Sequence, residues 1–117
     1  MTTLVALLST GKGSWAEVFK LLRSEVFEKA YLVTNTFGKE KCQEQANLVV
    51  VDLDQDVIHL RDALITALKE PLRYETEVAL NISSGTGAQH TALLSALLKL
   101  GVGIRLVIPT EGGVDEV

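Results

Sequence analysis

Two short segments of the sequence carry the residue types that bind phosphate groups. Residues 9–14 (STGKGS) and 83–87 (SSGTG) both combine glycine with hydroxyl side chains, and the first segment adds the cation Lys12. Glycine lets the backbone turn sharply and approach a ligand closely. A helix that begins directly after such a loop presents free N–H groups and the positive end of its dipole to an anion. We therefore predict that each segment contributes to an anion site.

The residues of these segments differ in what they offer a ligand: hydroxyl donors, backbone close enough for contact, or an aromatic ring that could stack on a base. The hydroxyl donors are Ser9, Thr10, Ser14, Ser83, Ser84 and Thr86. The glycines whose backbone could contact a ligand are Gly11, Gly13, Gly85 and Gly87, and the aromatic ring is that of Trp15. The alternative is that both loops only turn the chain and cap a helix, and that the tryptophan packs in the core. Neither segment matches GxxxxGK[ST] or GxGxxG, which disfavours a generic ATPase or dehydrogenase.

The composition is that of one globular domain covering residues 1–117. The sequence is 47% hydrophobic and 22% charged, and its net charge of −4 argues against an extended nucleic-acid surface, which needs an excess of Lys and Arg. A single cysteine, Cys42, cannot form an internal disulfide, which suits a cytoplasmic location. No apolar run approaches the roughly 18–20 residues of a membrane span, so we expect no membrane partner.

We also expect no cofactor and no metal site. The acidic residues Asp52, Asp54 and Asp56 could hold Mg²⁺, but such a run is more typical of a helix start, where negative charge favours the dipole. His59 lies mid-helix, close to Arg61 and Asp62, and is expected to be solvated.

Apolar runs alternate with helical periodicity along the chain, which predicts an α/β fold. Strands are expected at residues 4–8, 30–34, 47–53, 78–82 and 103–108, and helices from residue 14, at 54–70 and at 88–100. Residues 35–45 are polar and partly helical in pattern, and a tail begins at Pro109. Near-continuous apolar strands joined by helices form a parallel sheet covered on both faces. We expect a Rossmann-like three-layer sandwich with a mainly parallel sheet of about five strands in the order 3-2-1-4-5.

In this order the two loops meet. The first and fourth strands are neighbours, and the helices that follow them lie on opposite faces of the sheet. The crevice between their carboxyl ends is the topological switch point, where open α/β sheets bind ligands. The sequence therefore predicts one shared anion site.

The second segment and its flanks also resemble a known family. Residues 78–107 (VALNISSGTGAQHTALLSALLKLGVGIRLV) resemble the signature of the CARF domains, the CRISPR-associated Rossmann-fold family, in which a strand ending in Asn leads to a small-Gly-Thr turn and an Ala/Leu-rich helix. Residues 4–14 (LVALLSTGKGS) resemble the first strand and ligand loop of that family. The resemblance implies a homodimer that binds a cyclic oligoadenylate of CRISPR antiviral signalling across its two-fold axis.

A stand-alone member of this family could also be a metal-independent ring nuclease, in which a ribose 2′-OH attacks the adjacent phosphate. Such a reaction needs groups that stabilise negative charge and a group that transfers a proton. The implied catalytic residues are Ser9, Thr10, Lys12 and His90, and the implied further ligand contacts are Asn81 and Gln89. Many members carry a lysine after the Gly-Thr turn, where this sequence has Gly87. Either Lys12 supplies this cation from the other loop, or cleavage is slow or absent.

Two alternatives stay open. The protein could be a non-catalytic sensor or a sequestering subunit, or it could be a small Rossmann-like domain that binds a mononucleotide or a sugar phosphate. The leucines of helix 88–100 favour a homodimer because they spread too far around the helix for one sheet face; the alternative is a fully buried helix in a single chain. These leucines are Leu93, Leu94, Leu97, Leu98 and Leu100.

Overall fold

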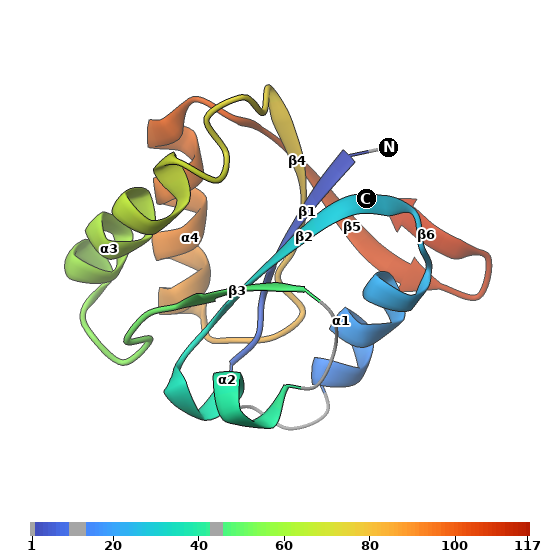
Figure 1. The fold of residues 1–117 in the computed structure, drawn as a ribbon, viewed down its shortest axis with the longest axis horizontal. Helices are drawn as coiled ribbons and strands as arrows, with labels where there is room; N and C mark the ends of the chain where they lie inside the picture. The colour runs from blue at the N-terminus through green and yellow to red at the C-terminus, as the bar shows by residue number, and fades with distance from the viewer. Residues whose placement is uncertain (1, 10–13, 43–45) are drawn as a thin grey trace.

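Strands and helices alternate along the chain in the structure, a computed structural model that describes residues 2–9, 14–42 and 46–117. The elements are β1 (Thr2–Leu7), α1 (Ser14–Arg23), β2 (Phe27–Thr34), α2 (Thr36–Lys41), β3 (Asn47–Val50), α3 (Val57–Lys69), β4 (Glu77–Asn81), α4 (Gly87–Leu100), β5 (Gly103–Thr110) and β6 (Gly113–Glu116). The described strands form a sheet in the order β3-β2-β1-β4-β5-β6 (Figure 1). This confirms the α/β class and the predicted order of the first five strands.

The sixth strand is the main departure from the sequence prediction, which has a tail from Pro109. β6 pairs antiparallel with β5, with Thr110 opposite Gly113, and Gly113 adopts a φ of +123° that favours glycine. The segment GVDE contains one large apolar residue, Val114. It forms a strand because the edge of β5 offers backbone partners, not because its own composition favours one.

β3 is shorter than the predicted strand 47–53, and α3 begins later than the predicted helix 54–70. β3 ends at Val50, and the Asp54 N–H donates to Asp52 Oδ1 at 2.9 Å in the turn that follows. α3 begins at Val57 because Asp56 is its N-cap: Asp56 Oδ1 accepts the His59 N–H at 3.0 Å. Asp52 and Asp56 thus shape the entry into α3, as the helix-start interpretation predicted.

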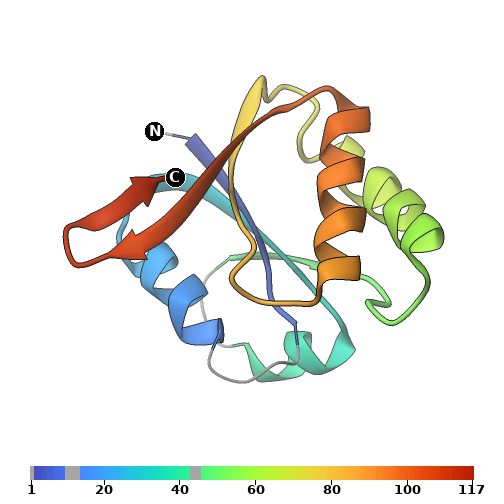
Figure 2. The same ribbon diagram turned by 180° about the vertical axis from the view of Figure 1, so that it is seen from behind.

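Alternate strand residues supply two separate cores, one on each face of the sheet (Figures 1 and 2). α3 and α4 cover one face, where Val5, Leu7 and Leu80 pack against them. α1 covers the other face. This is the period of two expected of strands buried on both sides.

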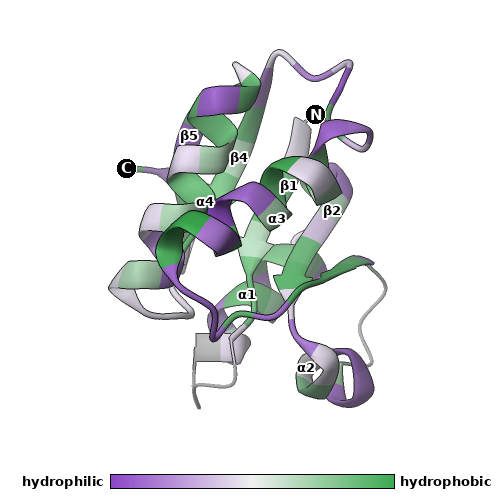
Figure 3. Ribbon diagram, turned by 90° about the vertical axis from the view of Figure 1, so that its left-hand side faces the viewer, coloured by the Kyte–Doolittle hydropathy of each residue, from purple (hydrophilic) through white to green (hydrophobic). Residues whose placement is uncertain are grey.

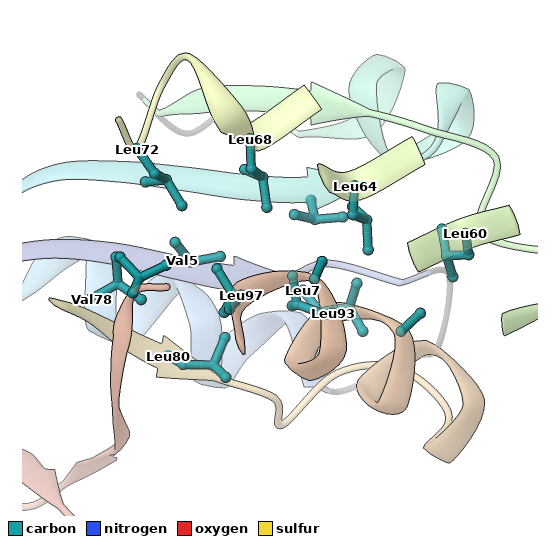
Figure 4. Packing of buried hydrophobic residues seen from close by; sticks show 14 of the residues in the cluster. Val5, Leu7, Leu60, Leu64, Leu68, Leu72, Val78, Leu80, Leu93 and Leu97 are labelled. Carbon is teal, nitrogen blue, oxygen red and sulfur yellow. The ribbon is translucent and has the colours of Figure 1, made fainter. Parts of the chain in front are cut away.

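The core beneath α3 and α4 is rich in leucine. Leu60, Leu64 and Leu68 of α3 point toward Leu93 and Leu97 of α4 and toward the sheet (Figure 4). The strands are largely hydrophobic, while hydrophilic residues lie on α3 and on the connecting loops (Figure 3). None of the described helices is long and apolar enough to cross a membrane.

Candidate functional site

The end of β1 and the β4–α4 loop both lie where the parallel strands have their carboxyl ends, at the lower side of the sheet in Figures 1 and 2. β1 pairs in parallel with β4, with Leu4 opposite Ala79 and Ala6 opposite Asn81. Because α1 and α4 follow these strands and pack on opposite faces, the sheet has its topological switch point here. Ser9, at the start of the first predicted segment, and the second predicted segment therefore lie side by side.

A direct hydrogen bond joins the two segments. The Ser9 N–H donates to Ser84 Oγ at 2.9 Å, across 75 positions of sequence. Ser84 has no exposed surface, and Ser9 is also buried. The predicted meeting of the two segments thus holds for the described residues, while Thr10, Gly11, Lys12 and Gly13 lie outside them.

The chain leading into the first loop is anchored on its other sides as well. The Ser9 carbonyl accepts a hydrogen bond from Trp15 Nε1 at the start of α1. The preceding carbonyl, of Leu8, accepts from Thr34 Oγ1 at 2.7 Å. Trp15 also meets Phe19 edge-on and contacts the core under α1, which is the packing role considered for it; stacking on a base stays a prediction.

The second loop approaches the first strand closely. Gly85 has a φ of +105°, and a Cβ atom there would overlap the Leu7 side chain and come within 2.9 Å of Gln89 Oε1. Only glycine fits both the conformation and the space without rearrangement. Gly87, two residues on, has no atom within 4 Å of where a Cβ would lie.

Thr86 and Gln89 form the start of α4. Thr86 Oγ1 accepts the Gln89 N–H at 3.2 Å, and Gln89 Oε1 accepts the Thr86 N–H at 3.1 Å, which is a capping box. Gln89 Nε2 also donates to the Leu53 carbonyl at 3.3 Å, tying α4 to the loop after β3. These two side chains therefore already satisfy part of the helix start in this structure.

The Asn81 side chain holds the base of the second loop through hydrogen bonds. Its Nδ2 donates to the Val107 carbonyl at 2.9 Å and to Ser83 Oγ at 3.0 Å, and its Oδ1 accepts the Ser83 N–H at 3.1 Å. The side chain is almost fully buried. Asn81 thus fixes the direction in which the chain leaves β4.

His90 lies in the first turn of α4 and bends back to the loop. Its Nε2 is 2.9 Å from the Ser84 carbonyl oxygen. A carbonyl oxygen only accepts, so Nε2 carries the proton and, in the neutral ring, Nδ1 holds the lone pair. Ser84 therefore contacts the first loop through its side chain and His90 through its backbone.

The predicted contacts separate into surface and buried residues. Of the predicted contacts whose exposure the structure describes, three are exposed (Ser83, Thr86 and Gly87), three are half-buried (Trp15, Gly85 and His90) and four are buried (Ser9, Asn81, Ser84 and Gln89). Ligand contact stays a prediction for all of them. Sequence reasoning missed Thr34 and Leu53: a threonine ending an apolar strand is a weak signal, and a backbone carbonyl leaves none.

Two hollows lie at or near this edge. One of about 230 Å³, beside Asn81 and Ser83, is walled mainly by apolar residues of β4, β5 and the chain end, among them Leu106, Ile108 and Val117. The other, of about 420 Å³, lies between α2 and the ends of β2 and β3; its lining residues include Phe37 and Val50.

The acidic residues after β3 contribute to the helix rather than to a cluster. The His59 N–H is the main cause that lowers the pKa of Asp56, and the His59 ring, 2.5 Å from Asp56 Oδ2, adds to it. His59 itself is largely exposed, as predicted. Within residues 2–9, 14–42 and 46–117, no group of three or more His, Cys, Asp or Glu side chains is placed to hold a metal ion.

The comparisons with known proteins come to two negative results. The sequence matches no protein-family model, and a search of the curated proteins found no match to it.

Proposed function

We propose that the protein binds a cyclic oligoadenylate at the switch point of its sheet. The observation that carries this proposal is the Ser9–Ser84 hydrogen bond, which joins two glycine- and hydroxyl-rich segments at one edge. An anion near this edge would meet the exposed Ser83 and the N-terminal end of α4, whose dipole favours negative charge. The resemblance to the CARF signature supplies the identity of the ligand.

We further propose that two copies of the chain share one ring. The hollow beside Asn81 and Ser83, at about 230 Å³, is below the usual range of roughly 300–1,000 Å³ for ligand pockets. Of the residues that wall it, Leu106, Ile108 and Val117 are exposed, and α4 exposes Leu98 to 68%. A second copy would cover such apolar surface, and a symmetric ring would make the same contacts with each copy.

Ring cleavage is a second activity that one observation favours. With Nε2 of His90 bonded to the Ser84 carbonyl, Nδ1 of the neutral ring is a lone-pair base. It would take the proton of a ribose 2′-OH as the 2′-oxygen bonds to the adjacent phosphorus. The bond from phosphorus to the 5′-oxygen breaks, the departing 5′-oxygen takes up a proton from water, and Nδ1 later releases its own proton to the solvent. The products would be a 2′,3′-cyclic phosphate and a 5′-hydroxyl, formed without a metal ion.

The test mixes the purified protein with labelled cyclic tetra- and hexa-adenylate in the presence of a chelator. We expect saturable binding of one of the two rings, and linear products with 2′,3′-cyclic phosphate ends if the ring is cleaved. Tight binding without turnover would identify a sensor or a sequestering protein. Binding of AMP but of neither ring would overturn the proposal in favour of a mononucleotide-binding domain.

A further inference from the structure

We infer that Asn81 is a positioning residue that makes the hydroxyl group of Ser83 a hydrogen-bond donor toward the ligand. The inference rests on the proposed function for its ligand, and its structural part concerns only the end of β4, the β4–α4 loop and β5. The Asn81 side chain is 1% exposed, whereas Ser83 is exposed. A side chain buried in this way acts on a surface ligand through the residue that it holds.

Two backbone groups fix the orientation of the Asn81 amide. The Val107 carbonyl only accepts hydrogen bonds, so the atom 2.9 Å from its oxygen is the donor Nδ2. The Ser83 N–H only donates, so the atom 3.1 Å from its nitrogen is the acceptor Oδ1. Exchanging the two ends of the amide would break both bonds, and the amide therefore has one stable orientation.

This orientation decides the role of the Ser83 hydroxyl. Asn81 Nδ2 donates its second hydrogen to Ser83 Oγ at 3.0 Å, so this oxygen already acts as an acceptor toward the protein. Among the residues that the structure describes, Ser83 Oγ has no acceptor for its own proton. Because Ser83 is exposed, its O–H group is free to donate to solvent or to a ligand.

A donor at this point selects an acceptor on the ligand. The hollow beside Asn81 and Ser83 is walled mainly by apolar residues, so the Ser83 hydroxyl supplies a polar contact that those walls lack. In the proposed complex it donates to a phosphate oxygen of the ring, because a hydrogen bond to a charged acceptor is stronger than one between neutral groups. Without the bond from Asn81 the hydroxyl would rotate, and the ligand would have to order it at a cost in affinity.

The experiment compares the wild type with Ser83→Ala, with Asn81→Asp and with the variant that combines the two changes. Aspartate keeps the shape of asparagine and an oxygen that accepts the Ser83 N–H, but it has no N–H for Ser83 Oγ. The Ser83 hydroxyl would then donate to the new carboxylate instead of to the ligand. Asn81→Ala, alone and combined with Ser83→Ala, is a second pair that carries the same test if the aspartate variants do not fold.

Two quantities are measured at a urea concentration and temperature at which every variant is folded. They are the Kd for the ring that the wild type binds and the hydrogen-exchange rate of the Ser83 amide. Ser24→Ala is the control, because the Ser24 hydroxyl donates to the Leu21 carbonyl at the amino end of β2, whereas Ser83 follows the carboxyl end of β4.

We expect Ser83→Ala to raise the Kd about tenfold, which corresponds to the loss of one hydrogen bond. Asn81→Asp should raise the Kd about tenfold more in the wild-type background than in the Ser83→Ala background, because it acts through the Ser83 hydroxyl. Repulsion between the new carboxylate and the ring is present in both backgrounds and cancels in this comparison.

The exchange rate separates this role from a merely structural one. The Ser83 amide should stay protected in Asn81→Asp, since the carboxylate still accepts its hydrogen bond. In Asn81→Ala the amide loses its acceptor and should exchange about tenfold faster. Ser24→Ala should change neither the Kd nor the exchange rate.

An equal rise of the Kd in both backgrounds would mean that Asn81 only holds the loop, which would overturn the inference and leave the proposed function standing. A Ser83 amide that exchanges as fast in the wild type as in Asn81→Ala would overturn the hydrogen-bond geometry. Binding of AMP but of neither ring would overturn the proposed function, and the same set of variants measured with AMP would then decide the role of Asn81. A wild type that binds none of the three ligands would overturn both proposals.

Discussion

Gly85 lies so close to the Leu7 side chain that a Cβ atom at this position would overlap Leu7 Cδ2. The contact seats the β4–α4 loop on the end of β1, next to the hydrogen bond between Ser9 and Ser84. It also gives the first testable prediction.

Gly85→Ala should lower the free energy of unfolding by about 2–4 kcal/mol, because alanine is strained at a φ of +105° and is overpacked against Leu7. Gly87→Ala is the matched control: its Cβ meets open space at the first position of α4. It should stabilise the protein by about 0.4–1 kcal/mol. Urea unfolding measures both, and equal effects would contradict the crowding at Gly85.

Thr86→Ala should destabilise the protein by about 1 kcal/mol, because it removes the N-cap of α4. The control is Thr91→Ala in the same helix. Thr91 is exposed and its Oγ1 donates to the Gly87 carbonyl at 2.8 Å, so alanine there should be neutral or stabilise the protein by about 0.3 kcal/mol. Thermal unfolding of the two variants in one buffer measures the difference.

Lys12→Ala should weaken binding of the cyclic oligoadenylate about tenfold and leave the fold intact, because the sequence puts this cation in the segment that we propose binds phosphate. Lys99→Ala is the control, since Lys99 lies in the last turn of α4, away from the loops. Fluorescence titration at two salt concentrations measures the affinities, and the variant should also show a smaller salt dependence. An affinity equal to that of wild type would exclude this role for Lys12.

Asp56→Asn should alter the pH dependence of stability. Hydrogen bonds from the backbone and ring of His59 lower the pKa of Asp56 in the folded protein. A lowered folded-state pKa contributes stability above the unfolded pKa, and this contribution is lost as the pH falls through the folded pKa. Wild type should therefore exceed Asp56→Asn in Tm at about pH 6, and the difference should shrink as the pH falls through the lowered pKa of Asp56. Glu111→Gln, in an exposed turn, controls for the change in net charge.

Leu98→Glu should convert a homodimer to monomers, because it would bury a charge in the proposed interface. Ile58→Glu is the matched control: Ile58 is 59% exposed, but it lies on α3. Sedimentation of the three proteins at the same concentration measures the change. A wild type that sediments as a monomer, or a dimer that survives Leu98→Glu, would contradict the proposed interface.

Much of the fold could be predicted from local pattern. Strands such as LVAL and helices such as 88–100, with Thr86 before it and Gly101 after it, carry their own apolar periodicity and end signals. With the rules of chain connection these leave few strand orders, of which the predicted one is observed for the first five strands. β6 could not be predicted in this way, because its pairing depends on the edge of β5 and its sequence is mostly polar.

The sequence by itself determined which residue types stand at the carboxyl ends of β1 and β4. Glycines, hydroxyl residues and the signals of a helix start can all be recognised within a few consecutive residues. Only the tertiary structure decided which of two adjacent serines is buried, that Ser84 Oγ accepts the Ser9 N–H, and that His90 turns Nε2 toward the Ser84 carbonyl. These choices depend on burial and on hydrogen-bond partners up to 75 residues away, and no local pattern encodes them.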